Sequence, residues 1–122
     1  QNIENLLKGD PFISQAMVHG DRRPYPVALI TLNPEELMKF AAAQGLPTVD
    51  PSALCAHPKV VARVGKIVEE RNGELQSYAK VKKFTVLPTD FTVENGFLTP
   101  TLKVKRKVIR EQYQTALDQL YR

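Results

Sequence analysis

Apolar and polar positions at the start of the chain predict a short helix followed by two strands. Apolar residues recur at helical spacing in residues 3–8. The Gly-Asp-Pro sequence at 9–11 should end that helix, because glycine suits a left-handed cap and proline cannot continue a helix. A strand should follow at about residues 13–19, and residues 27–32 predict a second strand, because they form a short apolar run that is β-branched at several positions. We expect these two strands to be antiparallel neighbours, because the link between them is short and polar.

Two longer helices are predicted in the middle of the chain. The first begins at residue 33, where Asn-Pro-Glu-Glu supplies a capping side chain, a proline and first-turn carboxylates, and it should run to about Gln44. The second begins at 57 with His-Pro, and its apolar residues trace one face until about Gly73. Residues 46–56 contain two prolines, so they predict a loop or a broken turn.

A third strand and a last helix complete the predicted elements. The strand is expected at residues 82–87, and the Asn95-Gly96 pair that follows is a strong turn signal. The helix follows Lys103, and one apolar stripe along it should pack inward. That stripe comprises Val104, Val108, Ile109, Tyr113, Ala116, Leu117, Leu120 and Tyr121.

Interleaved strands and helices without a dinucleotide fingerprint favour an α+β domain over residues 1–122, with a short, mainly antiparallel sheet and helices packed on it. A chain of 122 residues accommodates one such domain with a modest core, but not two. Hydrophobic residues make up 43% and charged residues 25%, as in ordinary globular proteins. The apolar faces predict that ten side chains are largely buried: Val18, Leu29, Ile30, Val64, Ile67, Val68, Phe84, Val86, Ile109 and Leu117.

Composition excludes several classes of protein. No apolar run approaches the roughly 20 residues that a membrane-spanning helix needs, so an integral membrane protein is not expected. The single cysteine, Cys55, cannot form an internal disulfide, and with His19 and His57 it gives no metal-ligand spacing. We therefore expect no metal site and a reducing, cytoplasmic location. The chain starts on Gln1 inside a helical pattern, so we expect it to be a piece of a longer protein.

Basic residues form two clusters that account for most of the net charge of +4. Lys103 precedes the last helix, directly after a turn-rich segment, and a point charge held at such a junction suits an anionic, phosphate-bearing partner. The alternative is a solvated lysine beside a helix. Lys105 and Arg106 are candidate phosphate contacts, although the same face would also suit an anionic membrane surface or solvent alone. The first cluster contains Lys80, Lys82 and Lys83, and the second contains Lys103, Lys105, Arg106, Lys107 and Arg110.

The remaining polar residues are interpreted as structural. No Ser, Cys or carboxylate arrangement around the histidines indicates a triad. No aromatic residue is interleaved with the basic run, so nucleic acid is not an expected partner. Surface or turn positions are expected for Arg22 and Arg23, capping or surface positions for His19 and His57, and turn positions with the carboxylate capping nearby backbone for Asp10, Asp21 and Asp90.

The segment from Gly96 to Lys107 carries a resemblance to a known family. Its Leu-Thr-Pro-Thr-Leu-Lys sequence at 98–103 resembles the lysine motif near the carboxyl terminus of acyl-adenylate-forming enzymes, in the version of long-chain fatty-acid:CoA ligases. Further similar motifs occur in the same order along nearly the whole chain. They are the residues at 2–8, the Asp-Pro-Phe-Ile-Ser-Gln turn at 10–15, the Gly-Asp-Arg-Arg-Pro turn at 20–24, Ala-Leu-Ile at 28–30, and residues 84–91.

This resemblance implies a function for the whole chain. It implies a small mobile lid domain, truncated at its N-terminal edge, that works with an absent N-terminal adenylation domain. The parent enzyme would use ATP and CoA, with Mg²⁺ bound mainly by the absent domain, to convert a long-chain fatty acid first to acyl-adenylate and then to acyl-CoA. Lys103 would bind ATP and fatty acid during adenylation and then rotate away, so it should be exposed and lack a buried carboxylate partner. Most of the superfamily has glycine before this lysine, where this chain has Leu102.

Two other interpretations stay open. The chain resembles, more distantly, the lid of other acyl-adenylating enzymes, such as carrier-protein loading ligases. It is also compatible with a basic, non-catalytic interaction module. The isolated chain is expected to be inactive under the leading interpretation, because it has no pocket for ATP or an acyl chain. The parent is expected in the cytoplasm, where peripheral contact with a membrane is compatible with the basic helix.

Overall fold

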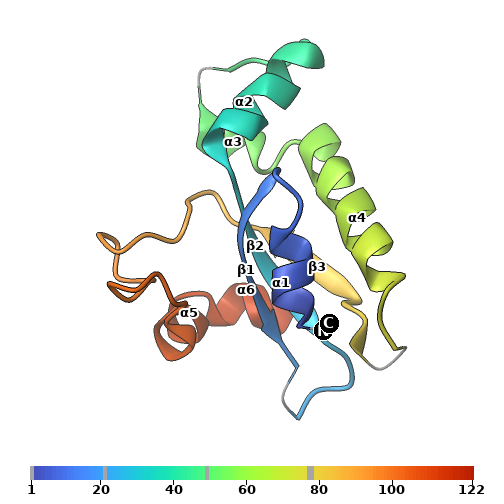
Figure 1. Cartoon of the computed structure of the whole chain (residues 1–122), viewed down its shortest axis with the longest axis vertical. Coiled ribbons are helices and arrows are strands. Elements are labelled where there is room, and N and C mark those ends of the chain that lie inside the picture. The colour runs from blue at the N-terminus through green and yellow to red at the C-terminus, as the bar shows by residue number, and fades with distance from the viewer. Residues whose placement is uncertain (1, 21, 49, 77–78) are drawn as a thin grey trace. The chain divides into compact units, whose positions relative to one another are not determined.

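The computed structural model describes residues 2–20, 22–48, 50–76 and 79–122. The chain divides into two compact units, Gln1–Asp90 and Phe91–Arg122. No helix among the described residues is both long and apolar enough to cross a membrane. Figure 1 shows the helices and strands of both units.

A three-stranded sheet organises the first unit. Strand β1 (Ile13–His19) pairs with β2 (Val27–Leu32) in antiparallel orientation, as predicted. Strand β3 (Lys83–Val86) is also present where predicted, but it pairs with β2 in parallel orientation, so the sheet is mixed rather than mainly antiparallel. The reason is the connection from β2 to β3, which passes through three helices and returns the chain to the end of the sheet where β2 starts.

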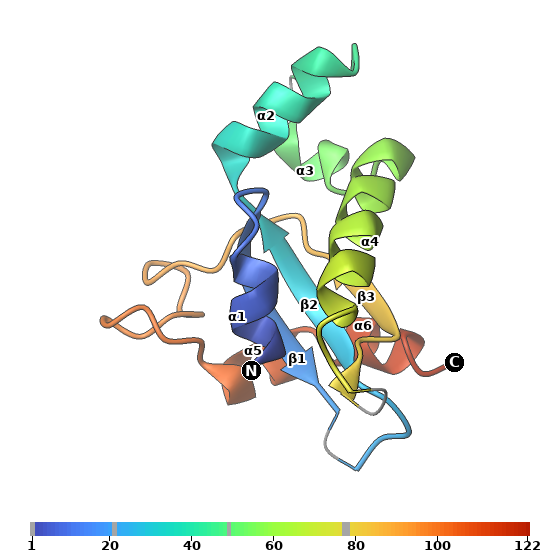
Figure 2. The same ribbon diagram turned by 45° about the vertical axis from the view of Figure 1, so that its right-hand side comes forward.

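Helices α1 (Ile3–Lys8) and α4 (Pro58–Asn72) lie beside each other against this sheet, with α1 next to β1 and α4 next to β3 (Figure 2). Both begin and end close to the predicted positions. Gly9 ends α1 at a φ of −66°, so its predicted left-handed cap is wrong. The glycine N–H instead closes the last turn onto the carbonyls of Asn5 and Leu6, which a right-handed backbone allows.

Helix α2 (Pro34–Ala43) also agrees with the sequence pattern. The Asn33 side chain accepts hydrogen bonds from the N–H groups of Glu35 and Glu36, and a glycine with a φ of +69° follows the helix. The predicted loop at 46–56 contains a short helix, α3 (Pro51–Leu54). The Asp50 carboxylate accepts a hydrogen bond from the Ser52 N–H, and Pro51 occupies the first turn, so the local capping signals suffice for one turn of helix.

Apolar side chains from these elements form the core of the first unit, and most burial predictions are confirmed. Those of the first unit that are buried as predicted are Leu29, Ile30, Val64, Ile67 and Val68, and Ile109 and Leu117 of the second unit are also buried as predicted. Val18, Phe84 and Val86 are half-buried and pack at the margin of the core. The core cluster joins α1, α2 and α4 to one another through residues such as Leu7, Leu37 and Val60, so it holds the sheet and these helices as one body.

The second unit contains two short helices where one was predicted. Helix α5 (Arg106–Gln112) is followed by α6 (Gln114–Gln119), and Tyr113 between them has a non-helical backbone. Hydrogen bonds from the Tyr113 N–H to Ile109 and from the Leu117 N–H to Tyr113 continue across the junction, so it is a kink. The Tyr113 ring contacts the Phe97 ring at 5.8 Å between centroids, which fixes the side chain at the kink. Val108 is 43% exposed, so its assignment to the inward stripe is wrong.

Candidate functional site

The candidate site begins with a tight turn after Phe91. The Asn95 side-chain oxygen accepts hydrogen bonds from the N–H groups of Thr92 and Phe97, at 2.9 and 3.2 Å. The Thr92 hydroxyl accepts one from the Asn95 N–H at 3.0 Å, and Gly96 has a φ of +84°. The predicted Asn-Gly turn is therefore confirmed, and hydrogen bonds to the side chains of Thr92 and Asn95 stabilise it.

The residues that we call the lysine loop, Leu98–Val104, form a second closed turn. Leu98 and Val104 form an antiparallel bridge at its base. Inside it, the Thr99 N–H donates to the Lys103 carbonyl at 2.8 Å, and the Thr99 hydroxyl accepts from the Lys103 N–H at 3.0 Å. The backbone of Lys103 is thus held at both its N–H and its C=O, which orients the base of the side chain.

Leu102 adopts an unusual backbone conformation in this loop. Its φ is +65°, in the left-handed region that glycine enters freely and a leucine enters with strain. Its side chain is 63% exposed, so packing does not explain the conformation. The hydrogen bond from the Leu102 N–H to the Thr99 carbonyl at 2.8 Å shows that the turn itself imposes it. A glycine would adopt this φ without strain, and in this chain a leucine adopts it instead.

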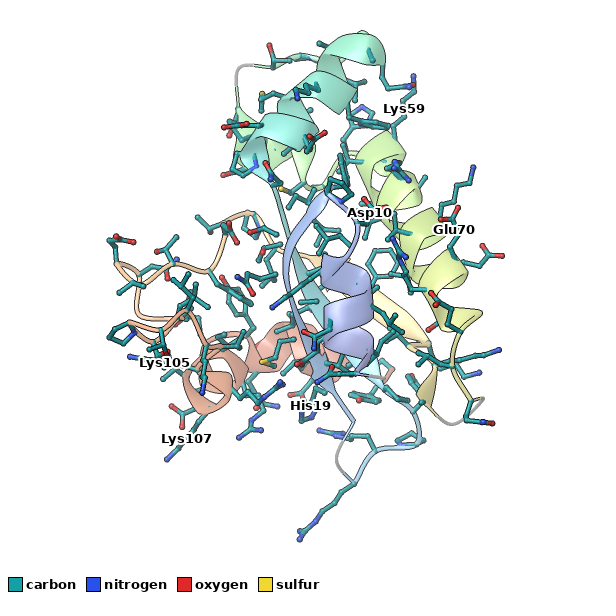
Figure 3. All side chains as sticks on the ribbon, viewed as in Figure 1. Asp10, His19, Lys59, Glu70, Lys105 and Lys107 are labelled. Carbon is teal, nitrogen blue, oxygen red and sulfur yellow. The ribbon has the colours of Figure 1, made fainter. Side chains whose placement is uncertain are left out.

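The Lys103 side chain is exposed and lies just before α5, as expected. Among the described residues, no carboxylate is within ion-pair distance of its ammonium. Lys105 caps α5 with its backbone only, and Arg106 opens that helix. Both are exposed, as are Lys107 and Arg110. Figure 3 shows Lys105 and Lys107 projecting from the start of α5 away from its ribbon.

The lysines and arginines around the lysine loop suit the binding of an anion. Residues 96–110 include five lysines and arginines and no Asp or Glu, so positive charge predominates in the lysine loop and the first part of α5. Such a charge attracts phosphate oxygens, and a lysine with a fixed backbone can present its ammonium to a developing negative charge. Within the described residues, no three His, Cys, Asp or Glu side chains are placed to hold a metal ion.

The other residues considered from the sequence occupy structural positions. His57 caps α4, because its Nδ1 accepts a hydrogen bond from the Lys59 N–H at 3.1 Å. His19 ends β1 (Figure 3), and Arg22 and Arg23 are exposed in the turn before β2. Cys55 is buried, and burial raises the pKa of its thiol, which disfavours the reactive thiolate.

The three aspartates differ from one another. Asp10 accepts a hydrogen bond from the Phe12 N–H at 2.9 Å and is the turn residue that was predicted. Asp21 lies outside the described residues. The interpretation of Asp90 as a residue that caps nearby backbone is incomplete, because its carboxylate accepts hydrogen bonds from two distant hydroxyls, Ser14 and Thr31. Sequence reasoning missed this cluster, since nothing local to Asp90 indicates partners in the first two strands.

Comparison with known proteins gives a consistent family. A family model described as "AMP-binding enzyme C-terminal domain" matches residues 1–122. The chain is 36% identical to the long-chain-fatty-acid–CoA ligase FadD15 of Mycobacterium tuberculosis, over 98% of the chain and 20% of that protein. It is 32% identical to the peroxisomal long chain acyl-CoA synthetase 7 of Arabidopsis thaliana, over 99% of the chain and 18% of that protein. The chain thus spans about a fifth of the curated relatives that it matches.

A solved structure resembles the fold over the same extent. It is the A-PCP didomain of a carboxylic acid reductase from Segniliparus rugosus in complex with AMP. The TM-score is 0.71 at 27% sequence identity, covering 98% of this chain and 15% of that one. The similarity therefore covers the elements on which the lysine loop is built.

Proposed function

Because this chain belongs to the family of AMP-binding enzyme C-terminal domains, we propose that it is the lid of an ATP-dependent, AMP-forming long-chain fatty-acid–CoA ligase. The proposed substrates are a long-chain fatty acid, ATP and CoA, and the proposed partner is an N-terminal adenylation domain. The observation that carries the proposal is an exposed lysine whose backbone is fixed by the loop and whose ammonium has no ion-pair partner among the described residues.

Lys103 is assigned the catalytic role in adenylation. When a fatty-acid carboxylate attacks the α-phosphate of ATP, negative charge develops on the phosphoryl oxygens. An ammonium that is already oriented stabilises this charge more than it stabilises the ground state, which lowers the barrier. A lysine neutralised by a carboxylate of its own domain would lose part of this effect, so the absence of an ion pair within the described residues supports the assignment.

Lys105 and Arg106 are assigned to phosphate binding. They are exposed and adjacent to Lys103, and no acidic residue occurs between residues 96 and 110. Cations in such a position suit the phosphates of ATP or CoA. Mg²⁺ supplies charge neutralisation on ATP phosphates when bound, and we assign it mainly to the adenylation domain, as the family resemblance implies.

The lid is proposed to work in two orientations relative to the adenylation domain. In the first, Lys103 reaches the reacting carboxylate and phosphate. In the second, the lid rotates and withdraws Lys103, and CoA attacks the acyl-adenylate. A cytoplasmic location is proposed for the parent enzyme. The exposed cations of α5 also suit a peripheral contact with an anionic membrane surface.

The complete enzyme containing this domain tests the proposal. Fatty-acid-dependent exchange of pyrophosphate into ATP, followed by thioester formation with CoA, is the expected activity. Activity with a carrier-protein thiol and none with CoA would favour the alternative of a carrier-protein loading ligase. Absence of exchange with any carboxylic acid, together with salt-dependent binding to nucleic acid, would favour the basic interaction module. The isolated 122-residue chain should catalyse neither step.

A further inference from the structure

Leu102 combines a strained backbone with an exposed apolar side chain. Its φ of +65° is one that glycine would adopt without strain. The structure describes three other exposed large hydrophobic side chains, and Leu102 is the most exposed of the four. An exposed leucine alone is ordinary in a folded protein. A leucine that is both exposed and strained costs the fold free energy and buries little apolar surface, so folding alone does not account for its side chain.

The lysine loop holds the backbone of Leu102 in place. The bridge between Leu98 and Val104 closes the loop at its base, where Leu98 is buried. The Leu102 N–H donates to the Thr99 carbonyl at 2.8 Å, and the Lys103 N–H donates to the Thr99 hydroxyl at 3.0 Å. Hydrogen bonds therefore hold the chain on both sides of the Leu102 Cα. A side chain on a backbone that is already ordered loses less entropy when it docks against a partner.

The position of Leu102 in the sequence indicates which partner it meets. It directly precedes Lys103, and consecutive Cα atoms across a trans peptide are about 3.8 Å apart. The tip of the lysine loop, residues 100–103, is exposed throughout. Any protein surface that receives the Lys103 ammonium must therefore come close to Leu102 as well. Under the proposed function, that surface belongs to the adenylation domain.

We propose that Leu102 is a positioning residue for adenylation, which docks against an apolar surface of the adenylation domain beside the site that receives Lys103. The inference rests on the proposed function, because it assumes that Lys103 serves adenylation. The Leu102 side chain is buried in the first orientation of the lid and exposed in the second. Its burial therefore stabilises the first orientation relative to the second, and this difference in free energy shifts the population of lids toward adenylation.

Assays of the two half-reactions of the complete enzyme test this proposal. Leu102→Ala and Leu102→Gly should each lower the rate of acyl-adenylate formation at limiting fatty acid by about ten- to a hundredfold, the effect of losing one buried leucine. Thioester formation from supplied acyl-adenylate and CoA should not fall by more than about twofold, because Leu102 is undocked in the second orientation. Leu102→Met keeps an apolar side chain of similar volume, so it should retain most of the wild-type adenylation rate.

Three comparisons separate docking from other roles. If Leu102 only kept the loop rigid, Leu102→Ala would retain the rate that Leu102→Gly loses, because alanine restricts the backbone and glycine does not. If Leu102 contacted the acyl chain, the loss would grow from a short to a long fatty acid, whereas docking on the protein gives the same loss with both. Val93→Ala is the matched control, because Val93 is exposed in the same unit but lies outside the lysine loop. It should leave both half-reactions within about twofold of the wild type.

The outcomes are distinguishable. If Lys103→Ala leaves adenylation unchanged, the proposed function fails and this inference fails with it. If Lys103→Ala is severe but both Leu102→Ala and Leu102→Gly are harmless, only this inference fails. Equal loss in the two half-reactions would also overturn it, since a misfolded lid impairs every step while docking serves one orientation. A loss confined to Leu102→Gly, a loss seen only with the long fatty acid, or an equal loss in Val93→Ala would each overturn it as well.

Discussion

Leu102 offers a test of the loop geometry that presents Lys103. Its φ of +65° should impose about 1–2 kcal/mol of strain on any residue with a Cβ atom. Glycine removes that strain, but it makes the unfolded chain more flexible, which costs about 0.4–1 kcal/mol relative to alanine. Leu102→Gly should therefore be more stable than Leu102→Ala by about 0.5–1 kcal/mol. Both variants lose the same partly exposed side chain, so its packing cancels.

Glu94 supplies the matched control in the same unit. It is exposed, and its φ is not positive. Glu94→Gly should be less stable than Glu94→Ala by about 0.4–1 kcal/mol. At this position glycine relieves no strain in the folded chain and only makes the unfolded chain more flexible. Urea unfolding of the four variants, followed by circular dichroism, measures both differences. The prediction is a reversal of sign between the two positions. A glycine that destabilises equally at 94 and 102 would show that the loop does not require a left-handed residue.

Other predictions concern the first unit. Ile67→Ala should lower the free energy of unfolding by about 2–5 kcal/mol in a urea titration, because Ile67 is fully buried. Val61→Ala, in the same helix but 37% exposed, should cost under about 1 kcal/mol, and equal losses would contradict the assigned faces. Burial raises the pKa of the Cys55 thiol in the folded chain above its ordinary value of 9.0. The protonated thiol therefore makes its full contribution to stability below the pKa that it has in the unfolded chain. That contribution is lost as pH rises through its higher pKa in the folded chain. The wild type should therefore lose more stability than Cys55→Ala between neutral pH and about pH 10, and the reverse ordering in urea titrations would refute this.

The fold was largely predictable because its main signals are local. Caps and apolar spacing define α1, α2 and α4, and β2 is a short apolar run. The parallel placement of β3 depends on how three helices return the chain, which no local pattern encodes. The kink at Tyr113 lies in a continuous helical pattern without glycine or proline, and it coincides with a ring contact to Phe97.

The candidate site was predictable only in part, because some of its features depend on the folded backbone or on residues far apart in sequence. Lys103 is proposed as a site residue because its surrounding sequence is distinctive, and the Asn95 turn is a local signal. The left-handed backbone of Leu102 could not be predicted from a leucine, since the closed turn around it imposes the conformation. Asp90 bonds to hydroxyls that are 76 and 59 residues away in sequence, so only the folded chain brings the three groups together.

The role of Lys103 is tested most directly by assaying the two half-reactions of the complete enzyme separately. Lys103→Ala should lower the rate of acyl-adenylate formation by about 10²- to 10³-fold, which corresponds to about 3–4 kcal/mol of lost transition-state stabilisation. Thioester formation from supplied acyl-adenylate and CoA should stay within about twofold of the wild-type rate, because the lysine is withdrawn in the proposed second orientation of the lid. Equal loss in both half-reactions would contradict a lid that uses Lys103 for adenylation alone, and no loss in either would make Lys103 an ordinary surface residue.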